Sequence, residues 1–342
     1  MAQDHGSGHA VALLEPRELA HTARAQLEDL AAAAAGYADA GVAANTRRAY
    51  AADWADFSGW CAAHAVELAL ERGEAAPSSA VLLYLTAQAA AGLTVSTLER
   101  RRAGIRAQHR RFGLQAPDSP ELAQVWAGIK RTHGRPALKK RALVVEDLRR
   151  VVRRLPDSPA GARDRALLLV GFGAALRRSE LAGLELTGAG ASGPIRVAFV
   201  GGGLEIAIDR SKGDQEGRGA IVAVPFGKTL CPVSALRAWL DLAGIVRGAV
   251  FRPIDRHGRV GEGAISDRAA AEIVKRAVAG TKLDPALFGG HSLRSGLVTS
   301  ALEKGAATDA IMRQTRHAKV ETMLAYGQAH DRFARNAAGK LL

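Results

Sequence analysis

Residues 175–181 read Ala-Leu-Arg-Arg-Ser-Glu-Leu, and they close the longest apolar run of the chain, Leu167–Leu176. Since that run is about half the roughly 20 residues that a membrane span needs, it predicts a buried helix of a globular domain. Helical periodicity surrounds it: the pattern predicts one helix near Val145, one continuous helical stretch over 160–183, and further helices over 232–243, 265–278, 291–302 and 308–316. A short segment over 320–326 and a tail follow.

Between these helices the periodicity changes to alternation. Residues 194–200, 204–209 and 220–225 predict three short strands joined by Gly-rich or polar turns. The fold class expected for this half is α+β, mainly α with a small antiparallel β-sheet.

The preceding part predicts a small all-α domain of four helices. They are expected to begin at a capping Asn45, after Pro77, at a Ser96–Glu99 capping box, and at Ser119. Residues 130–141 have many charges and no periodicity, which predicts a basic linker. The expected organisation is an acidic Ala-rich leader over 1–40 with one helix around 16–30, a helical domain over 41–136 and a second domain over 137–342.

Charge gives the first indication of function. The chain of 342 residues carries a net charge of +13, with 48% hydrophobic and 24% charged residues. That composition excludes a disordered chain and a polytopic membrane protein, and the charge favours a polyanionic partner over a basic surface that serves only solubility. Residues 1–40 sum to −4, residues 41–136 to +4 and residues 137–342 to +13.

The cysteine content and the N-terminus indicate the cellular compartment. Two distant cysteines, Cys61 and Cys231, predict no disulfide framework, and the N-terminus has no secretory pattern. We therefore expect a cytoplasmic protein.

An ordered set of polar residues in the second block indicates chemistry. The set comprises Arg177, Lys212 in a predicted hairpin, His291 and Arg294 in His-Ser-Leu-Arg, His317, and Tyr326 nine residues later. Each residue alone has an ordinary structural explanation. In this order, the set resembles the tyrosine recombinases, or phage integrase family. That family has an Arg in a Leu-Arg-x-Ser-Glu-Leu setting, a hairpin Lys, a His-x-x-Arg, a second His or Trp, and a C-terminal Tyr.

The resemblance covers residues 140–330 by motif and residues 45–135 by architecture only. It implies a two-domain C-shaped DNA clamp and a core-binding helical domain before the catalytic one. It also places the protein with the nucleoid of a bacterium or with a phage. It also implies a covalent 3′-phosphotyrosyl intermediate formed without metal, ATP or cofactor. Implied partners are double-stranded DNA with specific recombination sites and further copies of the chain, a dimer per site and a tetramer in the synapse, with accessory DNA-bending proteins possible. The wording around His291 and Lys212 favours phage-type and mobile-element enzymes over the Xer group.

The chemistry of phosphodiester cleavage assigns a role to each residue. Tyr326 is the expected nucleophile, and because an ordinary tyrosine has a pKa near 10, His291 is its expected general base. Lys212 would protonate the leaving 5′ oxygen as general acid. The phosphate would be stabilised by three further residues, Arg177, Arg294 and His317. Glu180 is expected to orient the set, with a surface ion pair as the alternative.

Two departures from the family pattern lie beside this set. Arg316 stands where many members have Gly before the second His, and Ser295 stands where many have His. Neither is a catalytic position in the family. DNA contacts are expected from a basic helix face and the linker: Arg102, Arg106, Arg110, Lys139, Lys140 and Arg141.

Other site classes have little support. No phosphate-binding Gly-rich loop with Lys and Ser or Thr is present, and no His-Glu-x-x-His metal motif. Two alternatives of function stay open. One is a type IB topoisomerase-like nicking-closing enzyme, and the other is a catalytically silent DNA-binding regulator of the same fold.

Overall fold

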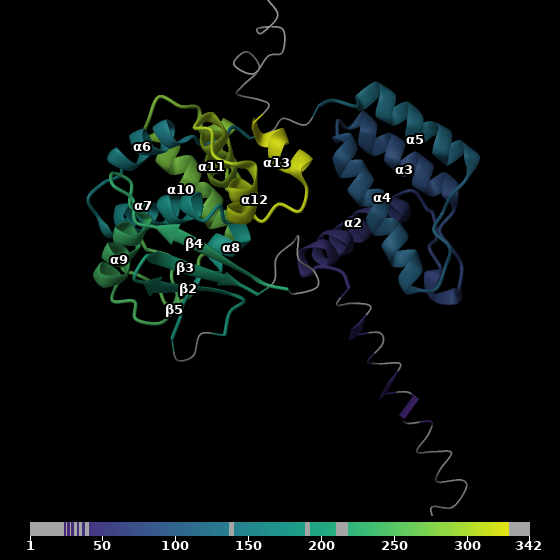
Figure 1. Cartoon of the computed structure of the whole chain (residues 1–342). Helices are drawn as coiled ribbons and strands as arrows, with labels where there is room; N and C mark the ends of the chain where they lie inside the picture. Colours follow the sequence, from purple (N-terminus) through teal and green to yellow (C-terminus); the bar gives the residue numbers. More distant parts are fainter. Residues whose placement is uncertain are drawn as a thin grey trace, which may run out of the picture. The chain divides into compact units, whose positions relative to one another are not determined.

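The computed structural model describes residues 41–136, 140–188, 192–209 and 218–327, together with residues 24, 26–27, 29–30, 33 and 36–37. The chain divides into two compact units, Met1–Ala137 and Leu138–Leu342 (Figure 1). The described residues between 24 and 37 are helical, and most of the helix expected around 16–30 lies outside the described residues.

The first unit is helical, as its periodicity predicts. Its core brings together side chains from all four helices, among them Phe57, Tyr84, Leu98 and Trp126. Because such aromatic residues bury much apolar area each, a few of them hold a small domain together. Its elements are α2 (Ala44–Ala63), the 3-10 turn η1 (Leu70–Arg72), α3 (Ser78–Ala90), α4 (Val95–Arg111) and α5 (Pro120–His133).

Two expected helix starts in this unit are wrong. α2 begins after Ala43 without a side-chain cap, so Asn45 lies inside the helix. α4 begins after Thr94, whose hydroxyl accepts a hydrogen bond from the Thr97 amide, so Thr94 and not Ser96 is the cap. Several capping residues adjoin there, and sequence alone does not choose among them. The Ser119 cap of α5 is confirmed.

The expected basic linker is shorter than 130–141. Residues 130–133 form the last turn of α5, and the amide of Arg141 donates to the Leu287 carbonyl of the second unit. Basic residues are favourable at a helix C-terminus, where they face the negative end of the helix dipole. The charge run therefore belongs partly to a helix end.

The second unit carries a five-stranded sheet of order β4-β3-β2-β1-β5. Three strands match the expected ones, β2 (Ile195–Val200), β3 (Gly203–Ile208) and β4 (Ala220–Pro225), and they pair antiparallel. β1 (Glu185–Leu186) pairs with β2 in parallel and with β5 (Gly248–Ala249) antiparallel, so the sheet is mixed and not purely antiparallel. Strands of two residues carry too little alternation to be seen in sequence.

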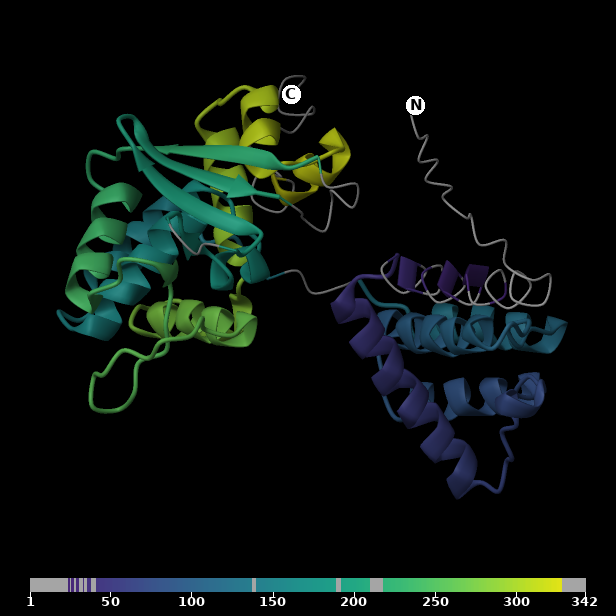
Figure 2. The ribbon, with the colours of Figure 1, turned by 90° about the horizontal axis from the view of Figure 1, so that it is seen from below.

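Helices cover one face of this sheet (Figure 2). Alternation in β4 buries Val222 and Val224 and leaves Ile221 exposed. Trp239 of α9 is fully buried in the same core as these two valines, and its indole N–H donates to the Val250 carbonyl. The helical elements are α6 (Val145–Arg153), α7 (Pro159–Gly173), α8 (Arg178–Ala182), α9 (Pro232–Ala243), α10 (Asp267–Ala279), the 3-10 turn η2 (Pro285–Leu287), α11 (Ser292–Glu303), α12 (Thr308–Thr315) and α13 (Val320–Gly327).

A break between α7 and α8 corrects the expected continuous helix over 160–183. Ala175 adopts a left-handed φ of +48°, and the Leu176 amide closes the end of α7 on the Gly171 carbonyl. Left-handed conformations usually call for glycine, and none stands there. The chain then runs extended through Arg177 before α8 begins.

Helix α11 is held tightly against the segment that precedes α6. The Leu143 amide donates to the Ser292 carbonyl, and the Val145 amide donates to the Ser300 hydroxyl. Gly296 makes this approach possible, since a Cβ there would lie 2.0 Å from the Leu143 carbonyl oxygen.

No helix of the described part of the chain is long and apolar enough to cross a membrane.

Candidate active site

Arg294 is the most buried charged residue among the described members of the predicted set. It is the third residue of α11 and is 1% exposed. Its Nη1 donates to the Ala175 carbonyl at 2.7 Å, and its Nη2 donates to the Thr315 carbonyl. Burial, with the charges of Arg177 and Arg316, lowers the pKa of Arg294 to about 10, so it stays charged at neutral pH.

Arg177 and Glu180 contact each other at the start of α8, just after the break that follows α7. The backbone amide of Arg177 donates to Oε2 of Glu180, and its Nη1 donates to Oε1, both at 2.8 Å. Glu180 is 3% exposed, so the alternative of a plain surface ion pair for it is wrong. The side chain of Arg177 keeps 21% of its surface exposed.

His291 and Tyr326 meet directly. Nε2 of His291, the residue that precedes α11, lies 2.7 Å from the hydroxyl of Tyr326 in α13. Desolvation by the surrounding protein, together with the charges of Arg294 and Arg177, lowers the pKa of His291 below its usual 6.5. A neutral imidazole beside a phenol is able to accept its proton.

His317 contacts the same tyrosine. Its ring stacks on that of Tyr326 with centroids 5.4 Å apart, and burial and then the charge of Arg294 lower its pKa to about 4. Its Nδ1 lies 2.8 Å from the Thr315 hydroxyl, which also lies 2.7 Å from the Ile311 carbonyl. Because a carbonyl only accepts, that hydroxyl donates to Ile311 and accepts from Nδ1 of His317. Nε2 of the neutral imidazole is then an acceptor.

Five of the six predicted catalytic residues thus lie in one cluster with Glu180. The five are Arg177, His291, Arg294, His317 and Tyr326. Lys212 falls between β3 and β4, outside the described residues.

Three contributors to the cluster were not predicted. The carbonyls of Ala175 and Thr315 hold Arg294, and no sequence signal marks a backbone acceptor. The third is Arg316, whose Nη2 donates to Oε2 of Glu180 at 2.6 Å. Its one sequence signal is that it replaces a glycine found in many family members.

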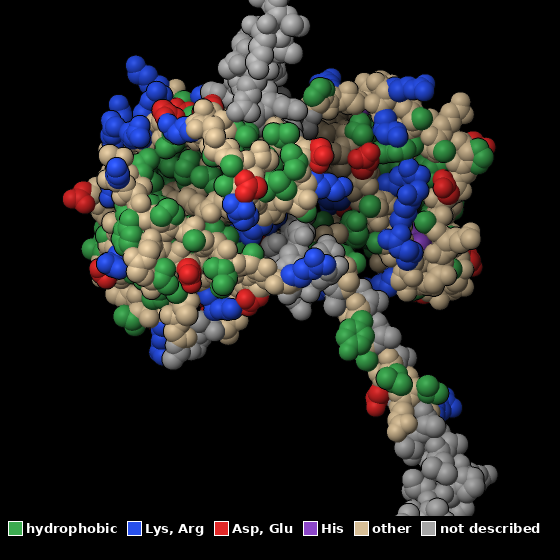
Figure 3. All heavy atoms as spheres, viewed as in Figure 1, with side chains coloured by type: hydrophobic (Ala, Val, Ile, Leu, Met, Phe, Trp, Pro, Cys, Tyr) green, Lys and Arg blue, Asp and Glu red, His purple; other side chains and the backbone are tan. Residues whose placement is uncertain are grey.

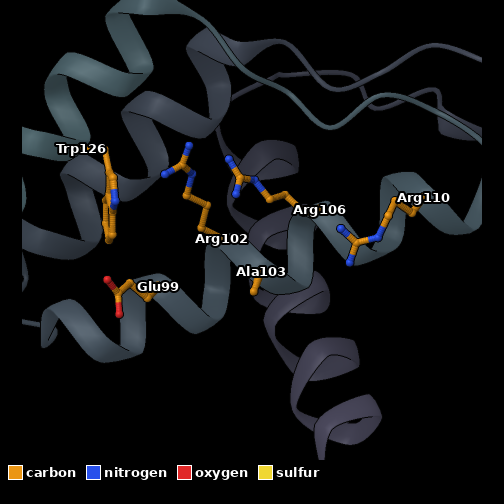
Figure 4. A pocket seen from close by; sticks show the side chains of 6 residues that line it. All are labelled: Glu99, Arg102, Ala103, Arg106, Arg110 and Trp126. Carbon is orange, nitrogen blue, oxygen red and sulfur yellow. The ribbon is translucent and has the colours of Figure 1, made fainter. Parts of the chain in front are cut away.

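The three predicted arginines of the first unit line a cavity of about 350 Å³ (Figure 4). They lie along α4, with Trp126 of α5 beside Arg102 at one end of the row. Lys and Arg side chains gather over this helix in the space-filling view (Figure 3). The Arg102 guanidinium sits 5.6 Å from the Trp126 ring centre, and its side chain is 16% exposed. Arg106 is 39% exposed, 4.0 Å from Asp118.

The predicted basic residues of the linker differ from one another. Lys139 lies outside the described residues. The ammonium of Lys140 donates to the Ala286 carbonyl at 2.6 Å, and Arg141 pairs with Asp147 at 3.3 Å. Both are thus engaged within the second unit.

Among the described residues, no three or more His, Cys, Asp or Glu side chains are grouped to hold a metal ion.

Comparison with known proteins gives one consistent result. The model of the phage integrase family matches residues 141–332. An integrase/recombinase xerD homolog of Selenomonas ruminantium is 33% identical over 304 residues, covering 87% of this chain and 85% of the relative. Tyrosine recombinase XerC of Xanthomonas campestris pv. campestris is 27% identical, covering 83% of this chain and 79% of the relative.

Two solved structures share the fold. A lambda integrase dimer bound to a core site has a TM-score of 0.55 at 14% identity, covering 91% of this chain and 96% of that chain. XerH recombinase in a post-cleavage complex with its palindromic substrate has a TM-score of 0.50 at 17% identity, covering 77% and 72%. Both agree with the mainly helical fold with a small sheet.

These relatives correct the expected subfamily. The sequence interpretation favoured phage-type and mobile-element enzymes over the Xer group, yet the curated relatives are named as a XerD homolog and XerC. The wording around two motifs is a short stretch of sequence, and similarity over most of the chain outweighs it.

Proposed function

The chain belongs to the phage integrase family, the tyrosine recombinases, and on that premise we propose that it cuts and rejoins DNA at specific sites through a covalent phosphotyrosine. The observation that carries the proposal is the contact between Nε2 of His291 and the Tyr326 hydroxyl, beside two arginines. A nucleophile, a proton acceptor and phosphate-binding cations are thus supplied by one chain.

The proposed first step transfers a strand from DNA to protein. The Tyr326 oxygen attacks the scissile phosphorus, and its proton passes to His291. The bond from phosphorus to the 5′ oxygen breaks, and Lys212 gives that oxygen a proton. The products are a 3′-phosphotyrosyl link and a free 5′-hydroxyl. A second 5′-hydroxyl then attacks the same phosphorus and gives its proton to Lys212. The bond from phosphorus to the Tyr326 oxygen breaks, and Tyr326 takes its proton back from His291. The phosphodiester is thereby restored, so that neither ATP nor a metal ion is needed.

Arg177 and Arg294 stabilise the charge that grows on the nonbridging oxygens. Both are charged, and the single carboxylate in contact with Arg177 leaves the cluster cationic. His317 contributes a further hydrogen bond to the phosphate once the Thr315 hydroxyl turns to donate to Nδ1, because only then does neutral His317 carry a proton on Nε2.

DNA binding is proposed to use both units, which would close around the duplex as a C-shaped clamp. Arg102, Arg106 and Arg110 would contact phosphates from the first unit, and Lys139, Lys140 and Arg141 from the start of the second unit. Such contacts position a protein on DNA without selecting the sequence. Two protomers per site and four in a synapse would follow the family pattern.

Strand exchange distinguishes this proposal from its rivals. A site would first be selected from randomised duplexes by binding to the full chain, and two copies would be placed on one supercoiled plasmid. A recombinase deletes or inverts the segment between them. Relaxation without exchange would indicate a topoisomerase-like enzyme, and binding with neither product would indicate a regulator.

A further inference from the structure

Arg316 occupies a position that is unfavourable for an arginine in two respects. It ends α12 with a left-handed φ of +56°, a conformation that favours glycine. Its side chain is only 10% exposed. Neither the backbone conformation nor contact with solvent therefore explains an arginine here.

The contacts of Arg316 lead to the cluster around Tyr326. Its Nη2 donates at 2.6 Å to Oε2 of Glu180, the oxygen that also accepts from the Arg177 amide. The other carboxylate oxygen accepts from Nη1 of Arg177. Within the described part of the chain, Nε and Nη1 of Arg316 are buried and have no hydrogen-bond partner. Buried donors without partners lower stability, so an arginine at this position has a cost to folding.

Charge in the cluster is unbalanced. Three guanidinium groups share the charge of one carboxylate, that of Glu180: Arg177 and Arg316 contact it, and Arg294 interacts with it at longer range. A carboxylate paired with a single arginine largely cancels the charge of that arginine. A carboxylate shared between two arginines leaves a net positive charge. A phosphate group, whose oxygens match the planar fork of arginine, would meet that surplus.

We propose that Arg316 is a positioning residue for strand cleavage, which shares the Glu180 carboxylate with Arg177 and so leaves the charge of Arg177 available to the phosphate. This inference rests on the proposed function. Arg316 acts through Glu180, because its one described polar contact is with that carboxylate.

The first test compares two arginines near one helix. Arg316→Gln removes the cluster's third charge, and Arg313→Gln removes an exposed charge paired with Asp309, as the matched control. Single-turnover formation of the protein–DNA adduct is expected to slow about 10- to 100-fold in Arg316→Gln and to stay unchanged in Arg313→Gln. Arg316→Lys is expected to recover most of the rate, since the single contact with Glu180 needs only one donor. Equal rates in wild type and Arg316→Gln would overturn the proposal.

A second variant separates positioning from folding. Arg316→Gly frees the left-handed backbone and removes the unpartnered donors, so it is expected to be at least as heat-stable as wild type and still slow to cleave. In a Glu180→Gln background, removing Arg316 is expected to add no further loss. A full further loss there, or a slow rate that matches a fall in the folded fraction, would contradict a role through Glu180.

A readout without DNA keeps this test apart from the proposed function. The charge of Arg316 is one of those that lower the pKa of His317. Titration of the His317 ring by NMR is therefore expected to show an upward shift in Arg316→Gln and none in Arg313→Gln. No shift would contradict the charge arrangement. A shift with no adduct from the wild type would reject the proposed function and leave the charge arrangement standing.

Discussion

Nε2 of His291 lies 2.7 Å from the hydroxyl of Tyr326, although 35 residues separate them in the chain. The ring of His317, two residues after the end of α12, stacks on the same tyrosine. One protomer therefore brings its own tyrosine to its own histidines and arginines, which is the arrangement that cleavage in cis requires.

The rate of cleavage is expected to fall in acid. Desolvation and the neighbouring arginines lower the pKa of His291 below 6.5, so its imidazole is neutral at pH 7 and becomes protonated only below that pKa. A protonated ring has no lone pair to accept the Tyr326 proton. Adduct formation measured on preformed complexes should therefore be level from about pH 8 to about pH 6.5 and decline only at lower pH. His291→Gln should be slow throughout, and a wild-type rate still undiminished at the lowest pH at which the complex stays intact would contradict the assigned base.

Arg294 is expected to serve both stability and catalysis. Arg294→Ala leaves the carbonyls of Ala175 and Thr315 without their donor and opens a cavity, which should lower the free energy of unfolding by about 2–4 kcal/mol. Arg294→Lys keeps the charge and loses the planar fork, so cleavage should slow by about 100- to 1,000-fold. Urea unfolding and single-turnover cleavage measure the two effects. A lysine variant as fast as wild type would show that charge alone is sufficient.

Arg106 and Arg110 are expected to contribute to affinity for DNA of any sequence. Arg106→Gln and Arg110→Gln should each weaken binding, and each should reduce the slope of log affinity against log salt by about one. Arg102 is left out because its contact with Trp126 ties it to the core. Arg72→Gln is the control, as Arg72 is 63% exposed and paired with Glu67. Salt slopes unchanged in both test variants would remove this helix face from the interface.

Gly296 is expected to be required for the position of α11. A Cβ there would lie 2.0 Å from the Leu143 carbonyl oxygen, so Gly296→Ala must displace backbone and should lower the free energy of unfolding by about 1–3 kcal/mol or more. Gly128 of α5 has nothing within 4 Å of the same added atom, and Gly128→Ala should stabilise its helix by about 0.5–1 kcal/mol. Thermal unfolding of both variants tests the pair, and a neutral Gly296→Ala would refute the close approach.

The sequence named five side chains that the structure brings together, but not the backbone groups that hold them in place. Arg177, His291 and Tyr326 are recognisable because phosphate chemistry demands particular side chains in a particular order. The break at Ala175 was missed, since a left-handed alanine leaves no mark in a helical pattern and only tertiary contacts impose it. Thr315 was missed because no sequence pattern marks it. Its carbonyl holds Arg294 as the carbonyl of any residue could, and its hydroxyl contacts His317 two residues later.

Element boundaries show the same limit in the fold. The 232–243 helix was predicted to the residue, because Pro232 begins it and Gly244 adopts the left-handed conformation just after it. β1 and β5 have two residues each, and their pairing depends on strands distant in sequence. Local patterns carry local structure, and the parallel pairing of β1 with β2 is not local.

The central claim is that Tyr326 is the nucleophile, and covalent trapping tests it most directly. Full-length wild type and Tyr326→Phe would be incubated in EDTA with selected duplexes labelled at either end, and SDS-resistant protein–DNA adducts would be measured. The account predicts an adduct on the 3′ side of the break with wild type and none with Tyr326→Phe, while both bind DNA equally. An adduct that persists in Tyr326→Phe, or none from a wild type that binds its site, would contradict it.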